Sequence, residues 1–203
     1  ADLIDIKTLN IIKEYYPKIK ISQWFLDRMD SKWTFNKKRF LDKINKMDAS
    51  FCTTDPSILK FSKKIPIYYF PNPVDESFEI LNNHKYKNLK NDVFFAMSHG
   101  VHRGVLKKGK FDERENFLKK LTNKLPNIKF DIYGIENKQP IWADNFIKTI
   151  SQSKIALNLS QGYGSKYYTS DRFAQLIGNG LLVMIDKKTQ FNDFFDKDEI
   201  VTY

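Results

Sequence analysis

Two apolar runs joined by a polar segment constrain the fold of this 203-residue chain more than any other feature. The runs occupy residues 155–159 and 181–185, and neither shows the in-and-out alternation of a half-exposed strand. Runs of this kind are typical of strands in a parallel sheet that is covered on both faces. The sequence therefore predicts two buried parallel strands in the carboxyl-terminal half.

The polar segment between these runs ends in a helix start. Ser170 offers a hydroxyl that can cap free amides, Asp171 places an acid in the first turn, and Arg172 follows. A polar, Gly- and Tyr-rich loop that enters a helix at the carboxyl edge of a parallel sheet is a common place for phosphorylated ligands. The sequence thus predicts where a ligand binds but does not yet identify the ligand.

Alternating helices and strands predict an α/β fold with two lobes and parallel sheets. We expect helices over 5–16, 35–47, 112–125 and 146–151, a helix start at 55–56, and strands over 18–25, 49–53, 65–70, 92–97, 128–133 and 200–203. Residues 1–72 form a partial first lobe, residues 73–91 a polar, Asn-rich connection, and residues 92–203 a second lobe. The first lobe has only about three strands, and the chain stops after a strand, so we expect the first lobe and the final helix to be incomplete.

The net charge of +10 favours anionic partners, which include nucleic acid, an acidic membrane surface and a nucleotide. The lysines are dispersed, however, and solvated lysines in a Lys- and Asn-rich chain need no polyanion groove. We expect no stable complex with nucleic acid, and we keep peripheral membrane association open. The single Cys52 excludes an internal disulfide framework, and no apolar run is long enough to span a bilayer. These features favour a cytoplasmic protein.

Several stretches share one family pattern. They are SQWFLD (22–27), FCTTDPSILKF (51–61), YYFPNPVD (68–75), DVFFAMSHGVHRG (92–104) with Arg114, SKIALNLS (153–160), SDRFAQLIGNGLLVMID (170–186) and DEIVTY (198–203). Together they resemble the GT-B glycosyltransferases, specifically the group with a spore-protein CgeB-like, glycosyltransferase group 1 type carboxyl-terminal domain. The acid of that family's R-x-x-E pattern falls on Gln175 here. The residues from Tyr168 to Arg172 are also similar, more weakly, to the nucleotide loop of α1,3-fucosyltransferases.

The resemblance implies two Rossmann-like lobes, a nucleotide-diphosphate sugar as donor, a glycan or other hydroxyl compound as acceptor, and no cofactor. The residues that it places at the donor site are Ser98, Gly100, Arg103, Tyr133, Gly134, Tyr163, Gly164, Tyr168, Ser170, Asp171, Arg172 and Gln175. Arg103, Arg172 and the amides around Ser170 are expected to supply charge and donors for the diphosphate.

Each of these roles has a structural alternative. Arg172 contacts phosphate, or it pairs with Asp171 or a neighbouring strand end. Gln175 holds the ribose or is merely exposed on its helix. Tyr133 stacks on the base or packs in the core, and Tyr163 is the other stacking candidate.

Catalysis needs a general base within reach of the acceptor hydroxyl. Asp27, beyond a strand of the first lobe, and His99, in the loop after residues 92–97, are the candidates. Asp27 could equally cap a turn, and His99 could contact phosphate. The chain has no His-x-x-x-His, and we expect metal-independent transfer.

The sequence thus predicts a nucleotide-sugar-dependent glycosyltransferase, or a fragment of one that binds nucleotide without transferring sugar. The alternative is a non-catalytic basic protein that binds nucleic acid or another polyanion. The sugar, the base, the acceptor, the stereochemical outcome and the oligomeric state stay open.

Overall fold

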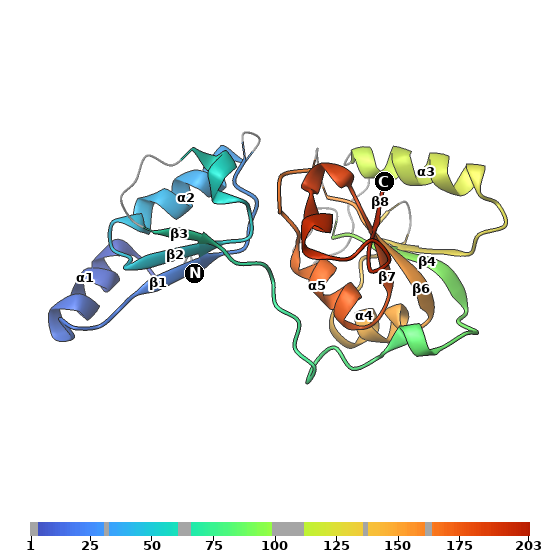
Figure 1. The fold of residues 1–203 in the computed structure, drawn as a ribbon, viewed down its shortest axis with the longest axis horizontal. Coiled ribbons are helices and arrows are strands. Elements are labelled where there is room, and N and C mark those ends of the chain that lie inside the picture. Colours follow the sequence, from blue (N-terminus) through green and yellow to red (C-terminus); the bar gives the residue numbers. More distant parts are fainter. Residues whose placement is uncertain (1–3, 31–32, 61–65, 99–111, 136–137, 161–163) are drawn as a thin grey trace. The chain divides into compact units, whose positions relative to one another are not determined.

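The protein consists of two compact units, each built on a parallel sheet (Figure 1). The computed structural model describes residues 4–30, 33–60, 66–98, 112–135, 138–160 and 164–203. Unit 1 comprises Ala1–Pro73, Ser165–Asp171 and Lys188–Phe191, and unit 2 comprises Val74–Gly164, Arg172–Lys187 and Asn192–Tyr203. The α/β class with parallel sheets and alternating helices, predicted for Rossmann-like lobes, is therefore confirmed.

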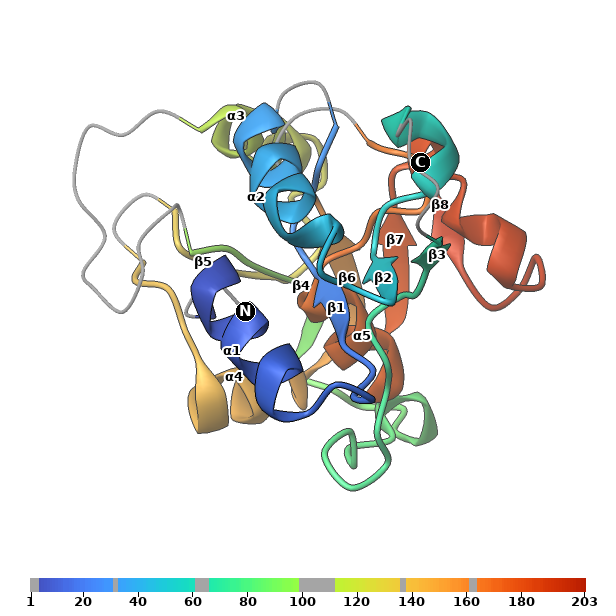
Figure 2. The ribbon, with the colours of Figure 1, turned by 90° about the vertical axis from the view of Figure 1, so that its left-hand side faces the viewer.

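Unit 1 contains a three-stranded sheet in the order β1-β2-β3, in which all neighbours are parallel. The strands are β1 (Ser22–Phe25), β2 (Ala49–Cys52) and β3 (Ile67–Tyr69), and the helices are α1 (Ile6–Tyr15) and α2 (Thr34–Ile44). Helix α1 lies beside β1, and α2 lies over one face of the sheet (Figure 2). This alternation of helices and strands matches the order predicted from the sequence.

The face of this sheet toward α2 carries the core of unit 1. Phe40 and Ile44 stand one turn apart on α2, and both are fully buried. They join Phe25, Met29, Cys52 and Leu59 in one apolar cluster. Full burial of an apolar side chain of this size contributes about 1.5–3 kcal/mol, so this cluster contributes several kcal/mol to the stability of the unit.

Local hydrogen bonds set the ends of several elements in unit 1. Asp48 Oδ2 accepts from the Ile21 amide at 2.8 Å, and the Asp48 amide donates to the Ile21 carbonyl at 2.7 Å, so a side chain takes the Ile21 amide out of the strand ladder. This explains why β1 begins at Ser22, whereas the sequence predicted a strand from residue 18. Asp55 accepts from the Ser57 amide at 2.8 Å and starts a single 3-10 turn, Pro56–Leu59, where a helix start was predicted.

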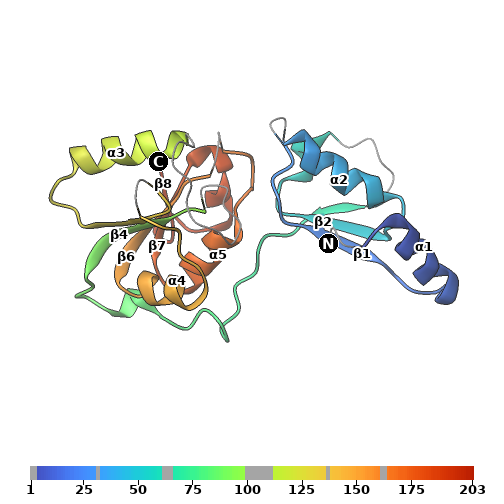
Figure 3. The ribbon, with the colours of Figure 1, turned by 180° about the vertical axis from the view of Figure 1, so that it is seen from behind.

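Unit 2 contains a five-stranded parallel sheet in the order β5-β4-β6-β7-β8. Its strands are β4 (Asn91–Ala96), β5 (Phe130–Tyr133), β6 (Ser153–Asn158), β7 (Leu182–Ile185) and β8 (Val201–Thr202), and its helices are α3 (Glu113–Lys124), α4 (Ala143–Ile150) and α5 (Asp171–Gly178). Helix α3 covers one face of the sheet, and α4 and α5 cover the other (Figure 3). The chain moves outward from β4 to β5 and then returns past β4 to β6. The winding direction therefore reverses between β4 and β6.

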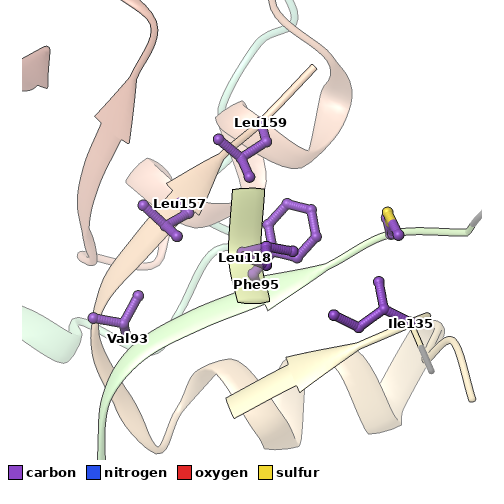
Figure 4. Close-up of a cluster of buried hydrophobic side chains, with 7 residues drawn as sticks. Val93, Phe95, Leu118, Ile135, Leu157 and Leu159 are labelled. Atoms are coloured by element: carbon purple, nitrogen blue, oxygen red, sulfur yellow. The ribbon is translucent and has the colours of Figure 1, made fainter. Parts of the chain in front are cut away.

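Both faces of this sheet are apolar, as the two continuous apolar runs predicted. Toward α3, Leu118 packs with Val93, Phe95, Leu157 and Leu159 (Figure 4). On the opposite face, the neighbouring strand positions Phe94, Ala156 and Val183 have no exposed surface. A sheet buried on both faces holds its strand ends in fixed positions, which is what a binding site at the sheet edge requires.

The segment before β4 is fastened to unit 2 by a buried asparagine. Asn83 lies in a 3-10 turn (Asn83–Lys85), is 2 % exposed, and donates from Nδ2 to the carbonyls of Ile150 and Ser153 at 2.7 and 2.9 Å. Its own amide donates to the Asn179 carbonyl at 2.9 Å. Part of the Asn-rich stretch expected as a connection thus packs against the ends of α4 and α5.

The described helices are all too short or too polar to cross a lipid bilayer.

Candidate functional site

The carboxyl ends of the five parallel strands meet at one edge of the unit 2 sheet, and Arg172 lies at the point where the winding reverses. Its guanidinium donates to the Ala96 carbonyl at the end of β4. It also donates to Asn158 Oδ1 at 3.3 Å and to the Leu159 carbonyl at 2.9 Å, at the end of β6. One side chain therefore joins the two strands that flank the reversal.

The sequence of α5 explains how Arg172 reaches this position. Phe173 and Leu176 stand three residues apart, are almost fully buried, and fix the helix against the sheet. The neighbouring positions Arg172 and Gln175, also three apart, share a second face and are half-buried. The guanidinium carbon of Arg172 lies 5.3 Å from the centre of the Phe95 ring, which supports it from the α3 side.

Of the alternatives open for Arg172, the structure shows contacts with strand ends. In open α/β sheets, ligands bind outside the carboxyl ends of the strands at the reversal of the winding. A fixed cation at that point is suited to a ligand with negative charge.

Asp186 and Tyr203 add ionisable groups at the same edge. Asp186 directly follows β7, and Tyr203 directly follows β8. Burial raises the pKa of the Tyr203 phenol above its ordinary value, the Asp186 carboxylate raises that pKa further, and the Arg172 guanidinium lowers it. The three groups are thus within electrostatic reach of one another. The Tyr203 ring also stacks on Phe117 of α3, with ring centres 6.3 Å apart.

Tyr133 and Gly134 lie at the end of β5, at the same edge. The Tyr133 hydroxyl donates to Asp131 Oδ2 at 3.4 Å, and the Lys138 ammonium lies 3.9 Å from the centre of its ring. Gly134 has φ +81°, and a Cβ on it would lie 1.8 Å from the Met97 carbonyl oxygen. Only glycine fits there, so the structure gives Gly134 a packing role beside β4.

Ser98 is exposed two residues beyond β4, again at the carboxyl edge. Gly164 is half-buried in the segment that precedes α5. Residues 165–171, which include Tyr168, Ser170 and Asp171, belong to unit 1. The structure thus brings together Ser98, Arg172 and the Tyr133–Gly134 pair on one sheet edge.

Helix α5 begins at Asp171, as predicted, but Ser170 does not cap it. The Ser170 hydroxyl oxygen is buried and has no hydrogen-bond partner among the described residues. The prediction that this hydroxyl satisfies the free amides of the helix is therefore wrong. Asp171 does place an acid in the first turn, where the helix dipole favours it.

Of the two general-base candidates, Asp27 is exposed two residues beyond β1. His99 lies outside the described residues, as do Gly100, Arg103 and Tyr163 of the predicted donor site. The roles assigned to all of these residues stay predictions.

Sequence reasoning missed Asn158, Asp186 and Tyr203. Asn158 is 2 % exposed and orients Arg172. A polar residue in or directly after an apolar strand marks the carboxyl edge of a sheet, and this signal could have identified Asn158 and Asp186. Tyr203 carried no such signal.

Within the described ranges, no three His, Cys, Asp or Glu side chains gather in a way that could hold a metal ion. Metal-independent transfer stays a prediction that only an assay can test.

Residues 113–203, from the first residue of α3 to the last residue of the sequence, match the model of a family described as glycosyl transferase-like. No curated protein matches the chain. The match covers Arg172, Asp186 and Tyr203. It supports glycosyl transfer in general and a glycosyltransferase group 1-like class for this part of the chain. The finer similarities to CgeB-like domains and to fucosyltransferases stay predictions.

Proposed function

We propose that unit 2 binds the diphosphate of a nucleotide sugar beside Arg172, and that the protein transfers the sugar to a hydroxyl acceptor. The observation that carries this proposal is the position of the Arg172 guanidinium, which joins the ends of β4 and β6 where the winding of the sheet reverses. Phosphorylated ligands bind at that point in doubly wound α/β sheets. The glycosyl transferase-like match over residues 113–203 supports the same class of reaction.

The chemistry assigns a task to each part of this edge. As the bond between the sugar and the diphosphate breaks, negative charge develops on the leaving nucleoside diphosphate. A guanidinium that hydrogen bonds to strand-end carbonyls already hold in place stabilises that charge without having to reorganise. Gln175, on the same helical face as Arg172, is suited to hydrogen bonds with ribose hydroxyls. Ser98 and Tyr133 lie at the same edge, where the Ser98 hydroxyl is suited to contact the phosphates and the Tyr133 ring is suited to stack on the base.

Nucleotide binding tests the proposal directly. The wild-type chain is titrated with UDP, GDP, ADP and CMP, and with nucleotide sugars, by calorimetry at low and high salt. We expect a nucleoside diphosphate to bind and to keep most of its affinity at high salt, whereas a polyanion site would lose affinity steeply. Binding and sugar transfer should persist in EDTA.

Variants of Arg172 give the sharper comparison. Arg172→Lys keeps the charge but loses the planar fork, and it should weaken nucleotide binding by roughly tenfold. Arg172→Met should abolish binding. The matched control is Arg39→Met on α2 of unit 1, where Arg39 lies over the Phe25 and Phe35 rings. Urea midpoints measured for each variant separate lost binding from lost folding. Failure of every nucleotide to bind, or full affinity in Arg172→Lys, contradicts the proposal.

A further inference from the structure

Asn158 interrupts the buried apolar run at the end of β6. It is the last residue of that strand, it pairs in register with Ile185 of β7, and it is 2 % exposed. A side-chain amide in such a place costs free energy unless its polar atoms form hydrogen bonds. Packing alone would favour an apolar residue at this position, so the reason for an asparagine lies in its polar partner.

The partner of Asn158 is the guanidinium of Arg172. Arg172 Nη2 donates to Asn158 Oδ1 at 3.3 Å and to the Leu159 carbonyl at 2.9 Å, while Nη1 donates to the Ala96 carbonyl. The two carbonyls belong to the backbone and are present whatever residues stand at these positions. Among these three acceptors, Asn158 Oδ1 is thus the one that depends on residue type.

Both members of this contact are fixed within unit 2. Asn158 ends the central strand of the five-stranded sheet, and the buried Phe173 and Leu176 hold α5, which carries Arg172, against that sheet. The Phe95 ring supports the guanidinium carbon from 5.3 Å. A hydrogen bond between two groups held in this way sets the plane of the guanidinium, and a planar fork binds phosphate only in a limited range of orientations.

The residue type at position 158 also sets the charge beside the guanidinium. Aspartate has the shape of asparagine, yet at neutral pH it would add a full negative charge at hydrogen-bond distance from Arg172 Nη2. A carboxylate binds a guanidinium about twice as strongly as a neutral acceptor does, and it would compete with a phosphate for the same cation. Leucine would remove the acceptor and add no charge. The amide of Asn158 provides the acceptor and likewise adds no charge.

We propose that Asn158 is a positioning residue for the donor diphosphate: it orients the Arg172 guanidinium through an uncharged acceptor, and so tunes the affinity of the site for phosphate groups. This inference rests on the proposed function and names the part of the ligand whose binding residue 158 controls. Because the effect acts through a cation, it should fall on phosphorylated ligands and spare the nucleoside, which carries no phosphate.

The test uses whichever of UDP, GDP and ADP binds the wild-type chain, together with the matching nucleoside. Calorimetry gives the Kd of the diphosphate, and saturation-transfer NMR gives that of the nucleoside. Asn158→Leu should weaken diphosphate binding roughly three- to tenfold, the effect of one net hydrogen bond. Asn158→Asp should weaken it roughly ten- to hundredfold, because it adds a charge. The affinity for the nucleoside should change by less than about twofold in both variants.

The matched control is Asn123→Asp, which adds the same charge elsewhere in unit 2. Asn123 is exposed in the last turn of α3. Helix α3 lies between the carboxyl end of β4 and the start of β5 in the chain, so its last turn lies toward the opposite edge of the sheet. Asn123 is about 15 Å along the helix from its first residue, which exceeds the Debye length of about 10 Å at moderate salt. This control should leave both affinities unchanged.

A double-mutant cycle shows whether Asn158 acts through Arg172. The ammonium of Arg172→Lys lacks the planar fork, so adding Asn158→Leu to Arg172→Lys should cost less than about twofold in diphosphate affinity. A residue that only supports the fold would show the same loss in both backgrounds, and that result would contradict the positioning role.

The outcomes separate this inference from the proposed function. A wild-type chain that binds none of the nucleotides refutes the proposed function, and the positioning role with it. A wild-type chain that binds a diphosphate, with unchanged affinity in Asn158→Asp or in Asn158→Leu, refutes the positioning role alone. Equal losses for the diphosphate and the nucleoside also refute it, because partial unfolding of unit 2 lowers both apparent affinities by the same fraction.

Discussion

Gly134→Ala should be among the most destabilising single-methyl changes available in unit 2. Gly134 has φ +81°, and the added Cβ would lie 1.8 Å from the Met97 carbonyl oxygen and 2.8 Å from its carbon. Met97 is 4 % exposed, and its amide donates to the Tyr133 carbonyl at 3.1 Å, so its backbone cannot move aside without loosening β4 from β5. The overlap falls on backbone and not on the end of a flexible side chain.

Two terms give the magnitude. A residue with a Cβ in the left-handed region costs about 1–2 kcal/mol, and forcing an extra carbon into a packed site costs about 1–3 kcal/mol. We therefore expect the free energy of unfolding of unit 2 to fall by about 2–5 kcal/mol, a large part of the stability of a domain. Because Gly134 lies at the proposed donor edge, nucleotide affinity should fall as well.

Amide hydrogen exchange of β4 and β5 peptides measures this loss in unit 2 by itself, since two units need not unfold in one step. Gly178→Ala is the matched control. The atoms nearest to a Cβ there belong to the side chains of Val74 and Glu79, at 2.5 and 2.7 Å, and alanine favours the helical backbone. Gly178→Ala should stay within about 1 kcal/mol of wild type. A loss below about 1 kcal/mol in Gly134→Ala would refute the packing argument.

Two further predictions concern ionisable groups of unit 1. Burial raises the pKa of the Cys52 thiol to about 11, so Cys52 should not react with a thiol reagent at pH 8 until the unit unfolds; rapid labelling of the native chain would contradict its buried position. The Ile21 amide, Lys13 and Lys20 lower the pKa of Asp48, and Lys166 and Ser57 lower that of Asp55 against the opposing effect of burial. The stability that these carboxylates contribute is therefore complete above the unfolded pKa of about 3.9 and is lost as the pH falls through their lower folded values. Amide exchange of β1 and β2 peptides should show that unit 1 loses stability below about pH 4. The loss should be smaller in the double variant Asp48→Asn/Asp55→Asn. Equal protection of these peptides at pH 3 and pH 7 would count against the two pairings.

Most elements were predictable because the signals that define them are local. The two continuous apolar runs became β6 and β7, with both faces of the sheet covered. Helix α1 ends at Tyr15, close to the expected stop before Pro17, and Asp112 caps α3 through the Arg114 amide at 3.0 Å. Side-chain periodicity and the missing amide of proline act within a few residues, so the sequence carries them in full.

The partners of the site residues were not predictable in the same way. Arg172 bonds to the carbonyls of Ala96 and Leu159, and a carbonyl is present at every position of the chain, so no residue type marks these two. Ser170 has the residue type of a helix cap, yet its hydroxyl meets no described donor or acceptor. Residue type states what a group can bond to, whereas packing decides what lies within reach.

The sequence alone thus determined that this chain builds parallel α/β sheets and that a polar loop enters a helix near residue 171. Only the tertiary structure placed β4 beside β6 and so put Arg172 where the winding reverses. Only the tertiary structure attached residues 165–169 to the first sheet, through contacts such as Tyr69 with Tyr167 that span 98 positions of the chain. The physical reason is that strand pairing and long-range hydrogen bonds depend on the closure of long loops, and no local pattern records which ends will meet.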